Sequence, residues 1–117
     1  MKKESFFNGK IIHLVTMTEW EKALNKGVYH PKSLELEGFI HFSTYANTLE
    51  SANLYYANEE ELVGLVVVLK WVKQNLVWEA GRNGEDFPHL YSGLSLENIE
   101  TTVQLCRNSE GKFEWDE

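Results

Sequence analysis

The sequence has one cysteine, no long apolar run and no segment typical of export. Because the thiol of Cys106 has no partner in the chain, a disulfide framework is excluded and a reducing compartment is favoured. A membrane-spanning helix needs roughly 20 apolar residues in a row, and this chain has no such run. The lysines near the start are followed by no apolar stretch long enough for a signal peptide. We therefore expect a cytoplasmic protein without a membrane-spanning segment.

Basic residues are also scarce, with 11 Lys and Arg against 18 Asp and Glu and a formal net charge of −7. Nucleic-acid affinity depends largely on Lys and Arg that neutralise phosphates, so this balance argues against general nucleic-acid binding. Acidic residues cluster at 59–61 and 110–117, which we interpret as solvated surfaces. A local basic pocket for a phosphate-bearing small molecule remains compatible with the composition.

Length and apolar content predict one domain. The chain has 117 residues, of which 43% are hydrophobic and 13% aromatic, enough to bury a core without covalent cross-links. We find no repeat or linker. We therefore predict a single domain over residues 1–117, with its core at about residues 11–107 and an acidic C-terminal tail at 108–117.

Hydrophobic periodicity predicts an α+β fold with a mixed, mostly antiparallel sheet and two main helices. A capping-box pattern at Thr18 opens the first helix, which Gly27 ends, and the second helix spans about residues 47–57. The run 62–69 is apolar and β-branched, as in a central strand covered on both faces. Pro88 places its strand at a sheet edge or a strand start. The other strands are expected at 11–16, 39–43, 76–79, 87–91, 99–107 and 112–115.

The predicted strand 39–43 carries two polar residues on one face. Alternation places His41 and Ser43 on the same side of the strand. His13 and His89 also lie in predicted strands among apolar neighbours, where a buried imidazole needs hydrogen-bond partners. Strands of one sheet could bring these histidines together. We therefore take the face with His41 and Ser43 as the centre of the candidate site.

Glu79 ends a short apolar strand, and burial beside apolar residues is expected to raise the pKa of its carboxyl group. Such a group can act as a general acid or base, or accept a hydrogen bond from a ribose hydroxyl. The alternative is an ion pair with Arg82 in the following turn.

Two familiar kinds of site lack their motifs. The four histidines form no H-x-H or H-E-x-x-H pattern and no cysteine pair accompanies them, so no metal ligand set is predicted. Ser43 with His41 and Glu79 is conceivable as a nucleophilic triad, although the G-x-S-x-G elbow is absent. A small metallo-hydrolase that uses the histidines stays open as an alternative.

Several segments follow the pattern of one family, and the most specific is Glu37-Gly-Phe-Ile-His-Phe-Ser43. On this pattern the chain resembles domain of unknown function 952, a family of short, mostly bacterial proteins without an established function, over about residues 11–99. The other matching segments are Ile12-His-Leu-Val-Thr, Trp20, Tyr29-His-Pro, Ser33-Leu, Trp78-Glu79 and Phe87-Pro-His-Leu-Tyr91.

The layout also resembles, more distantly, the ADP-ribosyltransferase fold and, within it, the RNA 2′-phosphotransferases. Those proteins have a histidine in the first strand and Val-His-Leu-Ser in a later one, and His13 and Ile40-His-Phe-Ser43 occupy the corresponding places. The resemblance implies that the first-strand histidine and the later hydroxyl hold NAD or an ADP-ribosylated intermediate, and that a later glutamate serves catalysis. The superfamily's His-Gly-Thr becomes His13-Leu-Val-Thr16, with the threonine one place later.

The resulting hypothesis is an ADP-ribosyltransferase-like protein that binds NAD, ADP-ribose or a related nucleotide. The enzymatic activity that this hypothesis includes is that of a transferase acting on a nucleotide or an ADP-ribosyl group. A non-catalytic binding domain is the alternative, because the threonine spacing is altered and basic residues are few. The metallo-hydrolase is the second alternative, and no metal site is assigned. The proposed catalytic residues are Glu79 and His41, and the proposed ligand-binding residues are His13, Thr16, Ser43, His89 and Tyr91.

Overall fold

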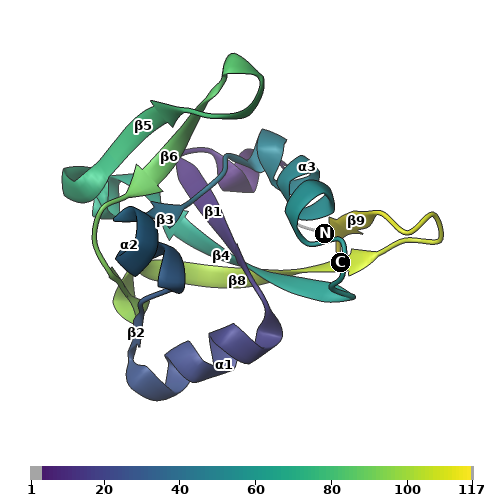
Figure 1. The fold of residues 1–117 in the computed structure, drawn as a ribbon, viewed down its shortest axis with the longest axis horizontal. Helices are drawn as coiled ribbons and strands as arrows, with labels where there is room; N and C mark the ends of the chain where they lie inside the picture. The colour runs from purple at the N-terminus through teal and green to yellow at the C-terminus, as the bar shows by residue number, and fades with distance from the viewer. Residues whose placement is uncertain (1–3, 117) are drawn as a thin grey trace.

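A computed structural model describes residues 4–116 and has an α+β fold, as predicted. Each strand pair in this range is antiparallel, so the predicted mixed sheet is instead three antiparallel sheets. Three helices pack against them (Figure 1). Within residues 4–116, no helix is both long and apolar enough to cross a membrane. The helices are α1 (Met17–Lys26), α2 (Lys32–Glu37) and α3 (Tyr45–Tyr55).

The largest sheet has the order β1-β4-β8-β9. Its longest pairings join β4 to β1 on one side and to β8 on the other, which confirms the apolar run 62–69 as a central strand. The strand β4 has six consecutive buried residues because both of its faces are covered. The strands of this sheet are β1 (Lys10–Val15), β4 (Glu61–Val68), β8 (Ile99–Arg107) and β9 (Phe113–Trp115).

Two smaller sheets lie beside this one, with the orders β3-β6-β5 and β2-β7. The chain after β3 connects the first of them to the large sheet. The Phe42 amide donates to the Pro88 carbonyl in the small sheet, and the next residue, Ser43, exchanges two 2.8 Å hydrogen bonds with Ile12 of β1. The strands of these sheets are β2 (Val28–Tyr29), β3 (Ile40–His41), β5 (Leu76–Ala80), β6 (Asp86–Leu90) and β7 (Leu94–Ser95).

Pro88 lies in the middle of β6, which is the middle strand of its sheet, so the predicted place at a sheet edge or a strand start is wrong. In an antiparallel ladder, the N–H and C=O of one residue point to the same side. The Pro88 carbonyl faces Phe42, just past the end of β3. The N–H that proline lacks would point to this same side, where β3 has already ended. The hydrogen bonds between β6 and β5 are therefore unaffected.

The N-cap of the first helix lies two residues before the predicted one. Thr16 is the N-cap of α1, and its hydroxyl accepts a hydrogen bond from the Glu19 amide at 3.2 Å. The sequence contains two overlapping Thr-x-x-Glu patterns, from Thr16 and from Thr18, and the end of β1 at Val15 selects the earlier one. Gly27 ends the helix in the left-handed region with φ 79°, as predicted.

The two faces of β1 belong to different parts of the core. Ile11 and Val15 pack in a cluster with Trp20 of α1, whereas Leu14 packs with Ala52 of α3. The core also extends beyond the predicted range 11–107. Phe7 is buried because η1 (Glu4–Phe7) packs on the large sheet, and Phe113 is buried because β9 is the last strand of that sheet. The other 3-10 turns are η2 (Leu69–Trp71), η3 (Lys73–Asn75), η4 (Arg82–Gly84) and η5 (Leu96–Asn98).

Candidate functional site

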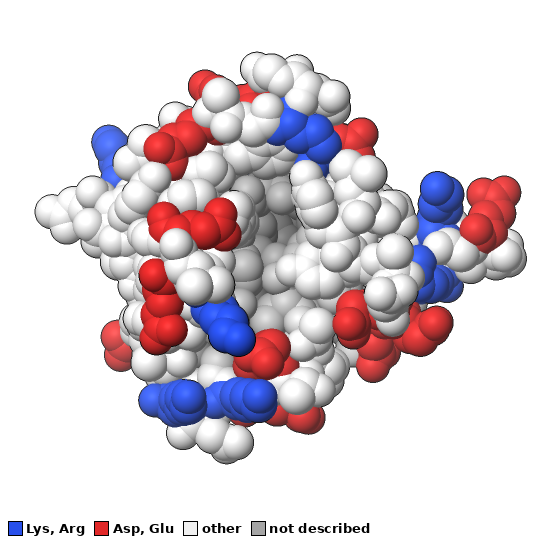
Figure 2. Space-filling view, viewed as in Figure 1, with Lys and Arg blue, Asp and Glu red and all other residues white. Residues whose placement is uncertain are grey.

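A cleft of about 1060 Å³ opens between β1, the β3–α3 segment and the β5–β6 hairpin. Figure 2 shows this hollow in the face of the molecule, with basic and acidic side chains around its rim. The charged residues at the cleft are Lys22, Lys32, Arg82, Glu19, Glu35 and Glu37. Its aromatic residues, other than histidine, are Tyr29, Phe42, Tyr55, Tyr56 and Phe87.

His13 lies in the floor of the cleft and is 7% exposed. Its Nδ1 lies 2.5 Å from the His41 carbonyl oxygen and its Nε2 lies 2.7 Å from the Tyr29 hydroxyl. Because a carbonyl oxygen only accepts, Nδ1 carries the hydrogen, and Nε2 of the neutral ring accepts from the Tyr29 hydroxyl. Burial lowers the pKa of His13 to about 4, so the ring is neutral at pH 7.

Ser43 and His41 reach the cleft in different surroundings. Ser43 is buried because its backbone pairs with Ile12 between the two sheets. The His41 side chain is 51% exposed, and its Nε2 lies 3.0 Å from Oε1 of Glu37 at the end of α2. Both residues line the cleft, and so does Phe42 between them.

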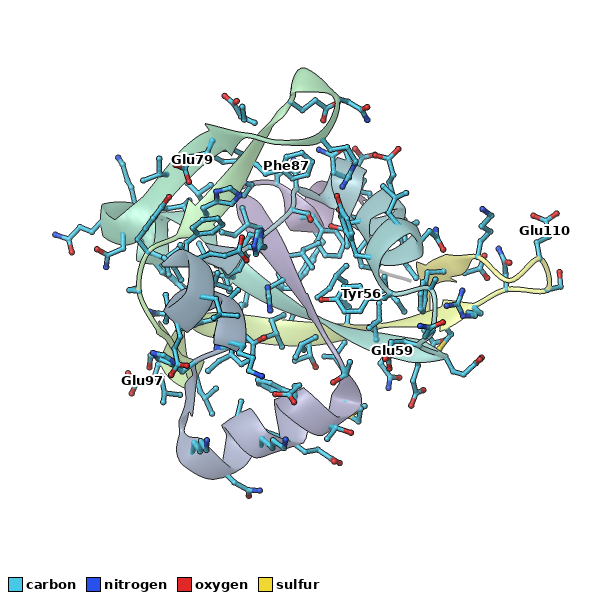
Figure 3. All side chains as sticks on the ribbon, viewed as in Figure 1. Tyr56, Glu59, Glu79, Phe87, Glu97 and Glu110 are labelled. Carbon is cyan, nitrogen blue, oxygen red and sulfur yellow. The ribbon has the colours of Figure 1, made fainter. Side chains whose placement is uncertain are left out.

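Glu79 lies on β5 and makes a different set of contacts from the predicted one. Its Oε1 accepts hydrogen bonds from His89 Nδ1 and from the Tyr91 hydroxyl, each at 2.6 Å. These bonds lower the pKa of Glu79, first through Tyr91 and then through His89, so the predicted rise is wrong. Arg82 pairs with Glu50 instead, at 2.8 Å. Figure 3 shows Glu79 on the hairpin.

The structure brings five of the seven predicted site residues to one cleft. The other two, Glu79 and Tyr91, do not line the cleft, although Glu79 is bonded to His89, which does. The five residues at the cleft are His13, Thr16, His41, Ser43 and His89.

Sequence reasoning missed the wall of the cleft formed by α3 and the hairpin. Arg82 donates to Glu50 and to the Ser51 hydroxyl, and thereby ties the hairpin to α3. Tyr56 donates to the Leu14 carbonyl oxygen at 3.4 Å, and Figure 3 shows its ring between α3 and β1 and Phe87 on the side facing α3. No local motif identifies these residues, because hydrogen bonds between segments more than 30 residues apart leave no sequence period.

Gly81 allows the hairpin to close on the Phe87 ring. A Cβ at this position would lie 2.6 Å from Phe87 Cδ1. Any side chain would therefore displace the aromatic wall of the cleft, because a rigid buried ring cannot give way at that distance.

The histidines do not form a ligand cluster in the part of the chain that the structure describes. No group of three or more His, Cys, Asp or Glu side chains there is arranged to hold a metal ion. The metallo-hydrolase alternative therefore has no ligand set among residues 4–116.

The sequence matches the profile of the family described as "Protein of unknown function (DUF952)" over residues 14–102. The chain belongs to the DUF952 family. This result confirms the first resemblance and covers the strands that carry His41, Ser43, Glu79 and His89. No curated protein matches the sequence.

Solved structures of a bacterial protein share the fold. The crystal structure of CC0527 from Caulobacter crescentus is 28% identical, with a TM-score of 0.83 over 90% of this chain and 93% of that one. The solution NMR structure of CC0527 is 30% identical, with a TM-score of 0.78 over 89% and 90% of the two chains. The similarity extends across nearly the whole fold described above.

Proposed function

We propose that the cleft binds a nucleotide-type ligand of the ADP-ribosyl class, with NAD and ADP-ribose as the first candidates. The observation that carries this proposal is the backbone edge of β1 inside the cleft, which no other strand covers among residues 4–116 and where the Leu14 carbonyl accepts from the Tyr56 hydroxyl at 3.4 Å. Ile12 points its amide and carbonyl away from β4, toward Ser43. Because this direction alternates from one residue to the next along an antiparallel strand, Leu14, two residues after Ile12, also points its amide and carbonyl away from β4. Within residues 4–116, no strand pairs with β1 there.

A planar amide or a nucleobase edge matches this donor and acceptor pair, because a carbonyl oxygen has a second lone pair beside the one that the Tyr56 hydroxyl uses. Leu14 and Tyr56 both line the cleft, so a ring that bonds the Leu14 backbone would lie close to an aromatic side chain. The Ser43 hydroxyl supplies a polar group beside it for a ribose hydroxyl, whereas both ring nitrogens of His13 are already hydrogen-bonded within the protein. Aromatic faces with a few convergent polar groups are typical of small-molecule sites.

Basic side chains at the rim supply contacts for phosphates. Lys22, Lys32 and Arg82 all line the cleft although the chain as a whole is acidic. Lys22 is exposed and its ammonium group lies 3.5 Å from Glu19, a weak pairing that a phosphate can replace. The resemblance to ADP-ribosyltransferases supports the same ligand class.

The place of Glu79 argues against its predicted direct role in catalysis and keeps a non-catalytic binding domain as the alternative. Its carboxylate lies outside the cleft and is engaged by His89 and Tyr91, so it does not contact a ligand in the cleft directly. Turnover of a nucleotide by the wild-type protein would exclude a purely binding role.

Titration of isotope-labelled protein with NAD and with ADP-ribose tests the proposal. We expect the Leu14 amide resonance to shift on binding, while that of Val66, in the middle of β4, stays in place. Isothermal titration should show weaker binding for Lys22→Gln and unchanged binding for Lys26→Gln, which lies on the same helix outside the cleft. An unmoved Leu14 resonance at saturating nucleotide would contradict the proposal.

A further inference from the structure

The pairing of β5 with β6 places a carboxylate beside a histidine of the cleft. Val77 is opposite His89 in the ladder, so Glu79 is the diagonal neighbour of His89 on the same face of the sheet. The resulting hydrogen bond from His89 Nδ1 to Glu79 Oε1 is 2.6 Å long. Such a short contact between an imidazole and a carboxylate is typical of charge-assisted bonds.

This hydrogen bond determines which nitrogen of His89 carries the proton. An ionised carboxylate only accepts, so Nδ1 of His89 carries hydrogen toward Glu79. Among residues 4–116, Nε2 of His89 has no hydrogen-bond partner. Because His89 lines the cleft, Nε2 is the ring nitrogen available to a bound molecule.

The surrounding rings hold the imidazole in this orientation. The Phe39 ring stacks on that of His89 with centroids 4.1 Å apart and an interplanar angle of 17°. The His89 side chain is only 12% exposed, whereas that of Glu79 is 38% exposed. A ring clamped on one face and bonded at Nδ1 has little freedom to rotate, which keeps Nε2 in place.

We infer that His89 is an acid–base group of the cleft and that Glu79 is the residue that positions it. The inference rests on the proposed function only for the identity of the ligand. Nε2 takes the proton from a water molecule or a ligand hydroxyl, and the electron pair of the broken O–H bond stays on that oxygen. The oxygen then forms a bond to an electrophilic carbon or phosphorus of the ligand, and the bond from that atom to the leaving atom breaks. The imidazolium charge is balanced by the Glu79 carboxylate, and the proton then returns to water or to the leaving atom.

Two other titratable groups lie around His89. The His41 ring lies edge-on at 5.3 Å between centroids and is itself bonded to Glu37. The Tyr91 hydroxyl donates to the same Glu79 oxygen as His89. The sequence hypothesis gave Glu79 and His41 the catalytic roles; the geometry favours His89 for contact with the ligand.

The tautomer of His89 tests this inference without a known substrate. Long-range proton–nitrogen correlation spectra at pH 8, assigned with a His89→Asn variant, should show hydrogen on Nδ1 and none on Nε2. Diethyl pyrocarbonate should acylate His89 in the folded protein, and mass spectrometry of peptides should show a severalfold slower reaction in Glu79→Gln. Tyr91→Phe, which keeps the bond between His89 and Glu79, should stay close to wild type.

Glu97→Gln provides the matched control, since Glu97 lies in η5 and does not line the cleft. Hydrogen on Nε2 in the wild-type spectrum would overturn the inference, as would an unreactive His89 beside a reactive His30. Nucleotide binding with an unreactive His89 would remove this inference alone. A reactive His89 without nucleotide binding would remove only the proposed ligand.

Discussion

His13 combines deep burial with full hydrogen bonding. Its neighbours on the same face of β1, Ile11 and Val15, belong to the apolar core, so a charged ring would be costly there. The His41 carbonyl and the Tyr29 hydroxyl satisfy both ring nitrogens only when the ring is neutral and carries its hydrogen on Nδ1. His13 therefore forms part of the floor of the cleft and also contributes to the stability of the fold.

The stability of the protein should fall as the pH is lowered through the range 6.5 to 4. The pKa of His13 is about 4 in the folded protein against 6.5 for a free histidine, so in this range the unfolded chain binds one more proton. A pKa displacement of this size corresponds to about 3 kcal/mol, of which roughly 2 kcal/mol is lost by pH 5. Urea unfolding at pH 7.5 and pH 5 measures the difference.

Two variants isolate the contribution of His13. His13→Phe should be less stable at pH 7.5 because it loses both hydrogen bonds, and its stability should change much less between the two pH values. His30→Gln removes an exposed histidine and should keep the wild-type slope. An equal slope in wild type and His13→Phe would show that His13 is not the titrating group.

At the scale of elements, Arg107 holds the segment that connects α3 to β4. Its guanidinium donates to the carbonyl oxygens of Tyr56, Ala57 and Glu59 at 2.7–3.0 Å, and to that of Gly111 at 2.6 Å. It also stacks on the Phe113 ring at 4.2 Å. Carbonyl groups at the end of a helix lack partners within the helix, and this arginine supplies them.

Replacement of Arg107 by lysine should destabilise the protein although the charge is retained. A single ammonium group cannot match the planar fork that reaches four carbonyls and a ring. Since a hydrogen bond to a charged group contributes roughly 1.5–3 kcal/mol, we expect a loss of at least about 2 kcal/mol in urea unfolding.

Lys112→Gln is the control for Arg107→Lys, because Lys112 is an exposed cation in the same hairpin. It should change stability by no more than about 0.5 kcal/mol. The Tyr56 carbonyl accepts from Arg107 and its ring lines the cleft, so Arg107→Lys should also weaken nucleotide binding. Stability equal to wild type would show that the contacts with the carbonyls contribute little.

At the scale of the whole molecule, one backbone crossing joins the two main sheets. Ile12 and Ser43 exchange two hydrogen bonds in a region where Ile12 is 0% exposed. Ile40 and Phe42, which precede Ser43 in the chain, belong to the same core cluster as residues of β1 and β4. The cleft lies beside this crossing, so its geometry depends on both sheets remaining docked.

Hydrogen exchange should therefore show that the two sheets open together. The amides of Ile12 and Ser43 should exchange only through global unfolding, with an exchange free energy equal to that from urea unfolding. Amides of the exposed β8–β9 turn, such as Ser109, should exchange much faster and serve as an internal reference. A markedly lower free energy at Ser43 would mean that the small sheet detaches on its own.

Part of the site could be predicted because strand alternation places His41 and Ser43 on one side of their segment, and both line the cleft. Phe42, which alternation places on the other side, lines it as well because the segment leaves β3 after His41. The error at Glu79 has a physical reason. The pKa of a carboxyl group depends on the donors that reach it, and Tyr91 and His89 reach Glu79 only through the packing of β5 on β6.

The sequence by itself determined the α+β class, the family, the central strand β4 and the helix end at Gly27, because these depend on local period and backbone preference. Only the tertiary structure decided which side of Pro88 lacks a strand, which threonine caps α1 and which residues close the cleft. Those outcomes depend on contacts between distant segments. His89 became the leading acid–base group for the same reason, since Glu79 orients it across two paired strands.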